Sequence, residues 1–218
     1  RQMWPGFTWR DLNVAARSLA AGLADLHDTG CVMGDLNDRN VLIGRDRQVS
    51  LVDLDSLQIA DTGVEPPRVH YCSAFASAYL APELQGLSLA GVQLSPTQDY
   101  FALAVLVFQL LLNGEHPFGS RWLGVDDPPA LERRIRAGWF PFRGAETGPV
   151  TPTPRLASLD ILGPSLRDLM NDAFVAGHAN PAQRPTPSAW VEALAAAERD
   201  LVEGECGHVY AGHHSSCP

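Results

Sequence analysis

The chain has 218 residues, which suits one sizeable domain and leaves no room for two large ones. Hydrophobic residues make up 45% of it and charged residues 19%, so a disordered or collagen-like protein is excluded. The formal net charge is −9, from 16 Lys+Arg against 25 Asp+Glu, which argues against nucleic acid or an anionic membrane as the main partner.

Apolar runs and cysteines indicate the compartment. The longest apolar run, residues 101–112, is shorter than the roughly 20 residues that cross a bilayer, so it predicts a buried helix. No basic segment followed by an apolar one opens the chain, as a signal peptide would. Four cysteines, two of them in the last 13 residues, do not form a disulfide framework for a body of this size. We expect a reducing, cytoplasmic setting.

The first half of the chain predicts one long helix and one hairpin. Residues 10–27 place leucine and alanine at helical spacing among strong helix formers. Residues 41–43 and 49–52 have the composition of two short strands, joined by a turn. Residues 53–83 have no sustained period, and we expect a long functional loop there.

The second half predicts further helices. Thr97 is expected to cap an apolar helix over residues 98–112, which Asn113-Gly114 ends. The Pro/Gly-rich residues 119–160 are expected at the surface, around a short helix at 129–137. The remaining helices are expected over residues 164–176 and 187–202. The predicted fold class is therefore mainly α with a small β-hairpin. The sequence does not indicate an oligomeric state.

Polar residues flank the predicted hairpin. Asn40 immediately precedes its first strand and Asp53 follows its second, so their Cα atoms would lie about 4.5–5.5 Å apart if the two residues are paired. Asp35 lies five residues before Asn40 on the entering loop. Amide and carboxylate oxygens suit Mg²⁺, and a separate Asp can accept the proton of an attacking hydroxyl. Taken singly, each of these residues is more commonly an ordinary turn or strand-end residue.

The stretch from Leu26 to Leu42 resembles the catalytic-loop region of the protein kinase fold, whose pattern is His-Arg-Asp-Leu-Lys-x-x-Asn. Asp53 follows Asn40 by 13 residues, the spacing that kinases use before their Asp-Phe-Gly motif. Three further blocks resemble kinase motifs in the same order. They are Tyr79-Leu80-Ala81-Pro82-Glu83, Asp99-Tyr100-Phe101-Ala102-Leu103-Ala104, and Arg184 within residues 180–185. The resemblance implies the helical C-terminal lobe of a protein kinase-like fold over residues 1–203, similar to a group of bacterial kinase-like proteins.

The resemblance also implies roles. Asp35 would be the catalytic base, and Asn40 and Asp53 would hold the Mg²⁺ that accompanies ATP. The scaffold residues would be the ion pair Glu83–Arg184 and Asp99, which would cap the backbone of the catalytic loop.

Several positions depart from the kinase pattern. Gly34 replaces an arginine on which a phosphorylated loop commonly docks, so activation by that route is in doubt. Asn37 replaces the lysine that helps to neutralise the γ-phosphate, and Arg39 is placed to supply that charge, although a solvated turn arginine is as common. Leu54-Asp55 replaces Phe-Gly, which removes a flexible glycine.

The phosphate-binding elements of a kinase N-terminal lobe have no counterpart in this sequence. There is no Gly-rich phosphate loop, and every one of the 16 basic residues is arginine, so the ATP-positioning lysine is missing. We expect a catalytic lobe that is inactive alone and that, with its N-terminal lobe, phosphorylates Ser or Thr of a protein substrate in preference to Tyr. The alternatives are a pseudokinase or docking scaffold, and a small-molecule phosphotransferase similar to the aminoglycoside and choline kinases.

The C-terminal tail, residues 204–218, is treated as a separate segment. Its candidate zinc ligands are Cys206, His208, His213 and Cys217, without a complete CxxC pair. Cys217-Pro218 would suit the first half of a Cys-Pro-x-Cys knuckle. The alternative is a disordered tail with incidental cysteines.

Overall fold

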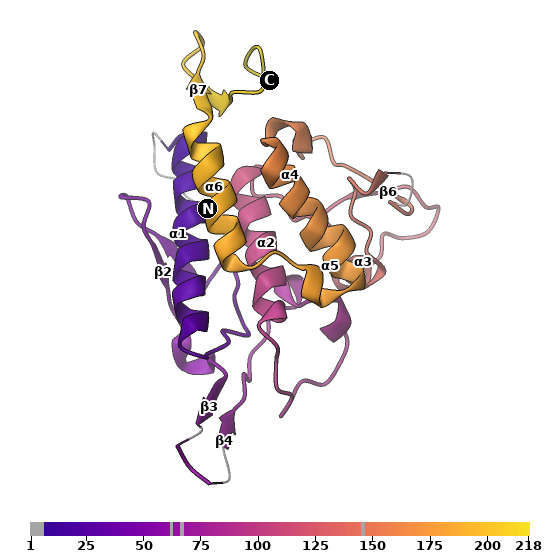
Figure 1. Cartoon of the computed structure of the whole chain (residues 1–218). Helices are drawn as coiled ribbons and strands as arrows, with labels where there is room; N and C mark the ends of the chain where they lie inside the picture. The colour runs from indigo at the N-terminus through magenta and orange to yellow at the C-terminus, as the bar shows by residue number, and fades with distance from the viewer. Residues whose placement is uncertain (1–6, 62, 66–67, 145–146) are drawn as a thin grey trace.

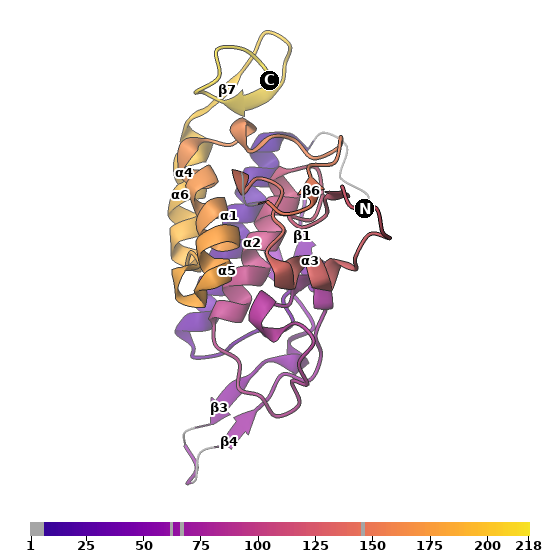
Figure 2. The same cartoon turned by 90° about the vertical axis from the view of Figure 1, so that its right-hand side faces the viewer.

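The computed structural model describes residues 7–61, 63–65, 68–144 and 147–218. Helices are the largest class of regular structure in these residues. In both views the β3–β4 hairpin extends from one end of the molecule and the β7–β8 hairpin from the other (Figure 1, Figure 2). The helices are α1 (Trp9–Asp28), α2 (Thr97–Leu111), α3 (Leu131–Ala137), α4 (Pro164–Asn171), α5 (Gly177–Ala179) and α6 (Pro187–Arg199), with a π-helical stretch, η6 (Asp172–Ala176), joining α4 to α5.

Short antiparallel sheets and 3-10 turns connect these helices. Each sheet in the described residues has two strands, paired β1–β2, β3–β4, β5–β6 and β7–β8. The strands are β1 (Val41–Ile43), β2 (Val49–Leu51), β3 (Ile59–Asp61), β4 (Arg68–His70), β5 (Arg121–Trp122), β6 (Val150–Thr151), β7 (Leu201–Glu203) and β8 (Val209–Ala211). The turns are η1 (Leu54–Ser56), η2 (Ser77–Tyr79), η3 (Pro82–Leu84), η5 (Leu159–Ile161) and η7 (Pro181–Gln183).

Helix α1 confirms the helix predicted at residues 10–27. It begins with a capping box, in which Thr8 caps the backbone of Asp11 and the Asp11 carboxylate accepts the Thr8 N–H. Its buried face is rich in alanine and leucine, and α6 packs along it beside α2 (Figure 1). At about 1.5 Å per residue, its 20 residues span about 30 Å, so α1 runs almost the length of the helical body.

Helix α2 is the buried centre of the fold. Most of its side chains are buried on every face, which explains why its sequence is apolar without a helical stripe. The predicted cap was wrong by one position, since Pro96 precedes the helix and Thr97 is its first residue. Asn113 and Gly114 follow with positive φ angles of 57° and 75°, as their sequence predicted for a helix end.

A cluster of phenylalanines joins α2 to the rest of the core. Neighbouring ring centroids within it lie 5.1 to 6.2 Å apart. The cluster consists of Phe101, Phe108, Phe118, Phe140 and Phe174. Phe140 and Ile135 are fully buried, so the expectation that residues 119–160 lie at the surface was wrong at these positions. Isolated apolar residues among prolines and glycines form no period, which is why the pattern did not reveal them.

The β1–β2 hairpin confirms the first predicted hairpin. Val41 pairs with Leu51, and both side chains pack against the main core. The Val49 N–H donates to the Ser18 hydroxyl of α1 at 2.9 Å, which fastens the hairpin to that helix. Leu42, on the opposite face, is 55% exposed.

Sheets other than β1–β2 were not expected. Residues 53–83, predicted as a loop, contain the β3–β4 hairpin, although Thr62 and Pro66-Pro67 fall outside the described residues. The tail forms half of the β7–β8 hairpin, which already begins at Leu201. Strands of two or three residues are too short to show alternation, so their sequence carries no signal. No helix in the described part of the chain is long and apolar enough to cross a membrane.

The predicted ion pair between Glu83 and Arg184 is present. The Arg184 guanidinium is fully buried and binds both Glu83 carboxylate oxygens, at 2.7 and 2.6 Å. It also donates to the carbonyls of Thr97 and Gly177, at 3.0 Å each. A Cβ on Gly177 would lie 2.5 Å from the Arg184 side chain, so glycine is needed there for this approach. One arginine thus joins η3, α2 and the α5–η7 region.

Replacing Arg184 tests this junction. Arg184→Met should lower the free energy of unfolding by about 2–3 kcal/mol, below the full cost of breaking a buried pair because the Glu83 side chain is 37% exposed. Arg167→Met is the matched control, because its partner Asp160 is 73% exposed, and it should cost less than about 1 kcal/mol. Urea unfolding measures both; equal losses would contradict the junction.

Candidate active site

A buried carboxylate fixes the loop that follows α1. Asp99, in the first turn of α2, accepts the backbone N–H groups of Met33 and Gly34 at 2.7 and 2.8 Å. His27 Nε2, near the end of α1, lies 2.8 Å from the same carboxylate. Asp99 is fully buried, so these three contacts replace the water it has lost. The expected cap on the loop backbone is therefore present.

Gly34 packs closely against Cys72, in the segment after β4. Its φ is +72°, and a Cβ there would come within 2.7 Å of Cys72 Sγ and 3.1 Å of Leu94. Both the backbone and the space therefore require glycine. The arginine of the kinase pattern has no room at this position, because Cys72 fills it.

Two asparagine amides organise the loop around Asp35. The side-chain Nδ2 atoms of Asn37 and Asn40 both donate to the Asp35 carbonyl, at 2.9 Å each. Asn37 Oδ1 accepts the Arg39 N–H at 2.9 Å, so both ends of the buried Asn37 amide are used within the loop. The Arg39 residue is exposed. Asn37 thus holds the loop together, while Arg39 faces solvent.

The Asp35 carboxylate connects this loop to the segment before η2. Its Oδ1 accepts the Ala76 N–H at 2.8 Å. Ala76 is 41 residues away in the chain, and no pattern in the sequence pairs it with Asp35. This contact was missed, because backbone donors look alike in every sequence.

Asp53 follows β2 beside Asn40. The Val52 N–H donates to the Asn40 carbonyl at 3.0 Å, which continues the β1–β2 ladder to the level of the candidate site. Asp53 itself has φ 60° and ψ 47°, a left-handed conformation that is uncommon for residues other than glycine, asparagine and aspartate. The left-handed conformation of Asp53 ends the extended strand and begins the η1 turn, so Asp53 stays at the end of the hairpin. Asp35, Asn40 and Asp53 are thus brought together at one end of the hairpin.

The charge around Asp53 is strongly negative. A hydrogen bond that the protonated Asp53 carboxyl donates to Asp55 raises the pKa of Asp53, and the negative charges of Asp55 and Asp35 add to this. Carboxylates that hinder each other's ionisation favour a cation among them. Oxygen donors and excess negative charge therefore fit Mg²⁺, with Asn40 supplying an amide oxygen. Asp55 was considered in the sequence only as the replacement of a kinase glycine. A second carboxyl two residues after Asp53 was the sequence signal that could have indicated this concentration of negative charge.

Uncharged polar side chains hold the backbone of residues 77–81. Gln98 accepts the Ala81 N–H at 2.8 Å and donates to the Tyr79 carbonyl at 3.0 Å. Gln85 donates to the carbonyls of Ser77 and Leu80. His116 Nε2 lies 2.8 Å from the Ala78 carbonyl, while its Nδ1 accepts the Phe118 N–H at 3.1 Å. Burial lowers the pKa of His116 to about 4, so this ring is neutral at pH 7. Sequence reasoning missed all three side chains, because single polar residues in apolar surroundings carry no motif.

The structural and sequence features agree with a comparison against known families. The family model described as "Protein kinase domain" matches residues 4–193. The chain belongs to the protein kinase family. It is 33% identical over 222 residues to "Protein kinase YegI" of Escherichia coli (strain K12), an alignment covering 100% of this chain and 34% of that protein.

More distant relatives cover less of the chain. "Serine/threonine-protein kinase kin-29" of Caenorhabditis briggsae is 28% identical over 183 residues, which cover 78% of this chain and 20% of that kinase. "Probable serine/threonine-protein kinase irlC" of Dictyostelium discoideum is 30% identical over 125 residues, or 53% of this chain and 8% of that protein. The chain therefore spans about a third of the YegI protein and smaller fractions of these kinases.

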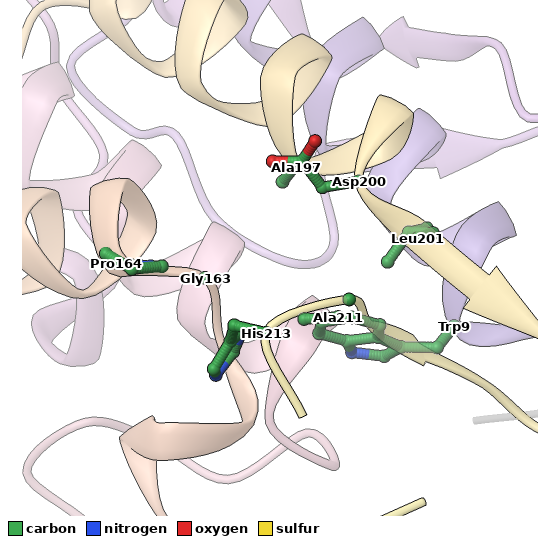
Figure 3. Close-up of a pocket in the computed structure, with 9 residues that line it drawn as sticks. Trp9, Gly163, Pro164, Ala197, Asp200, Leu201, Ala211 and His213 are labelled. Carbon is green, nitrogen blue, oxygen red and sulfur yellow. The ribbon is translucent and has the colours of Figure 1, made fainter. Parts of the chain in front are cut away.

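A cavity lies at the opposite end of α1 from the candidate active site. Its volume is about 330 Å³, and Figure 3 shows Trp9, at the start of α1, among its lining residues. The lining residues are Trp9, Gly163, Pro164, Ala197, Asp200, Leu201, Ala211, Gly212 and His213. Asp35 follows the other end of the helix, so the length of α1, about 30 Å, separates the two places. The cavity lies where the tail packs against the start of α1 and the end of α6.

Alanine substitution tests the close approach at Gly34. Gly34→Ala and Gly30→Ala both force alanine into positive φ, which costs about 1–2 kcal/mol. Only Gly34→Ala also meets Cys72 and Leu94, since nothing lies within 4 Å of a Cβ on Gly30. Gly34→Ala should therefore lower the free energy of unfolding by about 1–3 kcal/mol more than Gly30→Ala. Chemical denaturation measures the difference, and equal losses would contradict the packing described here.

The lowered pKa of His116 predicts a pH dependence of stability. The folded ring binds a proton only near pH 4, whereas the unfolded one does so near 6.5, so its contribution to stability is lost as pH falls between these values. From pH 7 to pH 4.5, wild type should lose about 2 kcal/mol more than His116→Gln, which has no titrating ring.

Urea unfolding at the two pH values measures this difference. If His116→Gln does not fold, the imidazole proton signals of wild type provide the measurement. A ring that becomes charged near pH 6.5 in the folded protein would contradict the assignment.

Proposed function

We propose that this chain is the helical C-terminal lobe of a protein kinase. Joined to an N-terminal lobe, it would transfer the γ-phosphoryl group of ATP to Ser or Thr hydroxyls of proteins, in preference to Tyr. The observation that carries the proposal is the convergence of Asp35, Asn40 and Asp53 at one end of the β1–β2 hairpin, amid excess negative charge. The family assignment supports the same reaction.

In this proposal Asp53 and the amide oxygen of Asn40 hold the magnesium ion. When bound, Mg²⁺ neutralises the triphosphate charge that would otherwise oppose the attacking hydroxyl. The Asn40 Nδ2 atom is already committed to the Asp35 carbonyl, so its Oδ1 atom is the one with ligand chemistry. A bound cation would favour the ionised form of Asp53, opposing the raised pKa that this carboxyl has beside Asp55.

Asp35 would accept the proton of the attacking hydroxyl. Its Oδ1 is held by the Ala76 N–H, so Oδ2 is the oxygen that would face the substrate. Asn37 and Asn40 act as positioning residues, because both fix the Asp35 carbonyl and hence its backbone. The exposed Arg39 would supply positive charge toward the transferred phosphoryl group.

Two features support an N-terminal lobe that covers the end of the β1–β2 hairpin, where Asn40 and Asp53 lie. The chain contains no lysine, so the ATP-positioning lysine of the family must come from outside these 218 residues. Leu42 and Leu54 are 55% and 44% exposed beside Asn40 and Asp53, where a nucleotide and an N-terminal lobe would cover them. We therefore propose that this chain by itself does not transfer phosphate.

Protein substrates are favoured by the segment that ends at Glu83. Arg184 holds that segment as it does in the kinase pattern, and two relatives are named serine/threonine-protein kinases. The four cysteines are free, which supports the proposed cytoplasmic setting.

A docking scaffold without phosphoryl transfer is the second candidate function. The observation that favours it is Asp55, whose carboxyl hydrogen bonds the proposed metal ligand Asp53. If this pair stays protonated in the whole protein, a cation would not bind there.

Carboxylate substitutions in the full-length protein test the reaction. Asp35→Asn and Asp53→Asn should each lower magnesium-dependent phosphate transfer from labelled ATP to a protein by at least about 10²-fold, because one removes the base and the other a metal ligand. Asp28→Asn, an exposed carboxylate at the end of α1, is the matched control and should retain activity.

The outcomes separate the candidates. Turnover at the wild-type rate in either active-site variant would refute the assigned roles. Absence of magnesium-dependent ATP binding to wild type, measured by calorimetry, would refute the kinase proposal in favour of the scaffold. Transfer to aminoglycosides or choline but to no protein would refute the substrate class.

A further inference from the structure

The C-terminal tail gathers three metal-ligand side chains at its outer end. Strands β7 and β8 pair with Glu203 opposite Val209, so the residues between them form a tight turn. Gly204 N–H donates to the His208 carbonyl at 2.9 Å, and Gly207 has a φ of +76°. The turn therefore presents Cys206 and His208 together, and the chain after β8 returns to bring in Cys217.

We infer that this tail binds a single zinc ion through Cys206, His208 and Cys217. The ligand atoms of the three side chains all lie within 4.8 Å of one another. All three residues are exposed, so an ion can reach them from solvent. The site is independent of the proposed kinase reaction, since it lies beyond the opposite end of α1 (Figure 1).

The spacing of the donor atoms suits tetrahedral zinc. Zinc–sulfur and zinc–nitrogen bonds of about 2.3 and 2.0–2.1 Å place the two ligand atoms about 3.6 Å apart at the tetrahedral angle. The observed distance from Cys217 Sγ to His208 Nδ1 is 3.7 Å. Little movement is therefore needed for these two atoms to share one ion.

The donor set selects the metal. Two sulfurs and an imidazole are soft to intermediate ligands, which favour zinc over magnesium or calcium. Zinc binds cysteine as the thiolate, so the cation would displace the thiol protons of Cys206 and Cys217. A Cys206–Cys217 disulfide would leave His208 without a role.

His213, a fourth candidate from the sequence, does not join this group. Its Nε2 lies 2.9 Å from the Asp160 carbonyl, and His214 Nε2 lies 2.8 Å from the same oxygen. Gly212 N–H donates to the Asp200 carbonyl at 2.8 Å, beside the cavity at the base of the tail (Figure 3). These contacts anchor the inner end of the tail, and zinc would order its outer end. Water or one further donor would complete the coordination of the ion.

Metal titration of the reduced, chelator-treated full chain tests the site. Zn²⁺ should bind with a stoichiometry of one. Co²⁺ should give the intense visible bands of a tetrahedral ion and a thiolate charge-transfer band, both removed by one equivalent of Zn²⁺. Cys206→Ser, Cys217→Ser and His208→Ala should each weaken zinc binding by more than the about 10–100-fold that the loss of an outer-shell partner costs.

Two matched variants control for composition and folding. His213→Ala removes a nearby imidazole that contacts the Asp160 carbonyl, and Cys31→Ser removes a thiol outside the tail; both should retain one zinc. Absence of the tetrahedral cobalt spectrum would overturn the inference, as would zinc binding that survives both cysteine substitutions. Equal loss of zinc in His213→Ala would overturn the three-residue ligand set. A Cys206–Cys217 disulfide that forms in place of zinc binding, seen by intact mass, would overturn it too.

Discussion

The buried carboxylate of Asp99 is the contact on which the geometry of the candidate active site depends. A buried carboxyl group is costly unless hydrogen-bond partners replace water, and here two backbone N–H groups and His27 do so. Because these donors come from the loop and from the end of α1, satisfying Asp99 fixes where the loop leaves that helix. The position at the first turn of α2 adds the favourable end of the helix dipole. Asp99 also helps to position Asp35, because Asp35 directly follows Gly34, whose N–H Asp99 accepts.

The segment before Glu83 is held in a different way. Its backbone groups pair with Gln85, Gln98 and His116, which carry no charge at neutral pH. Neutral side chains can pair with both the N–H and the carbonyl groups of a buried backbone, and burying them costs less desolvation free energy than burying ions. The ion pair of Glu83 with Arg184 has its carboxylate partly exposed. Amides and an imidazole thus hold residues 78–81, while the carboxylates of Asp35 and Glu132 contact Ala76 and Ser77 just before them.

The sequence predicted the features that follow from spacing within a short stretch. It placed Asn40 and Asp53 on either side of the hairpin. Through the resemblance to kinases, it also predicted the cap by Asp99 and the partner of Arg184. Contacts between a side chain and a distant backbone amide, such as Asp35 with Ala76, leave no trace in residue type. The left-handed backbone at Asp53 is a tertiary feature of the same kind. The tail shows both cases, because its ligand types were visible while the choice of His208 over His213 depends on where Asp160 lies.

The electrostatics of the candidate site and the composition of the chain have a joint consequence for the proposed reaction. A hydrogen bond with Asp55 and the negative charge of Asp55 raise the pKa of Asp53, and the charge of Asp35 adds to this effect. A triphosphate would add more negative charge to the same place, so this surface alone would repel ATP. The chain has no lysine, so arginine such as Arg39, the cation and a second lobe would have to offset that charge. Nucleotide and metal would therefore have to arrive together, and the cation would be the first requirement for binding as well as for phosphoryl transfer.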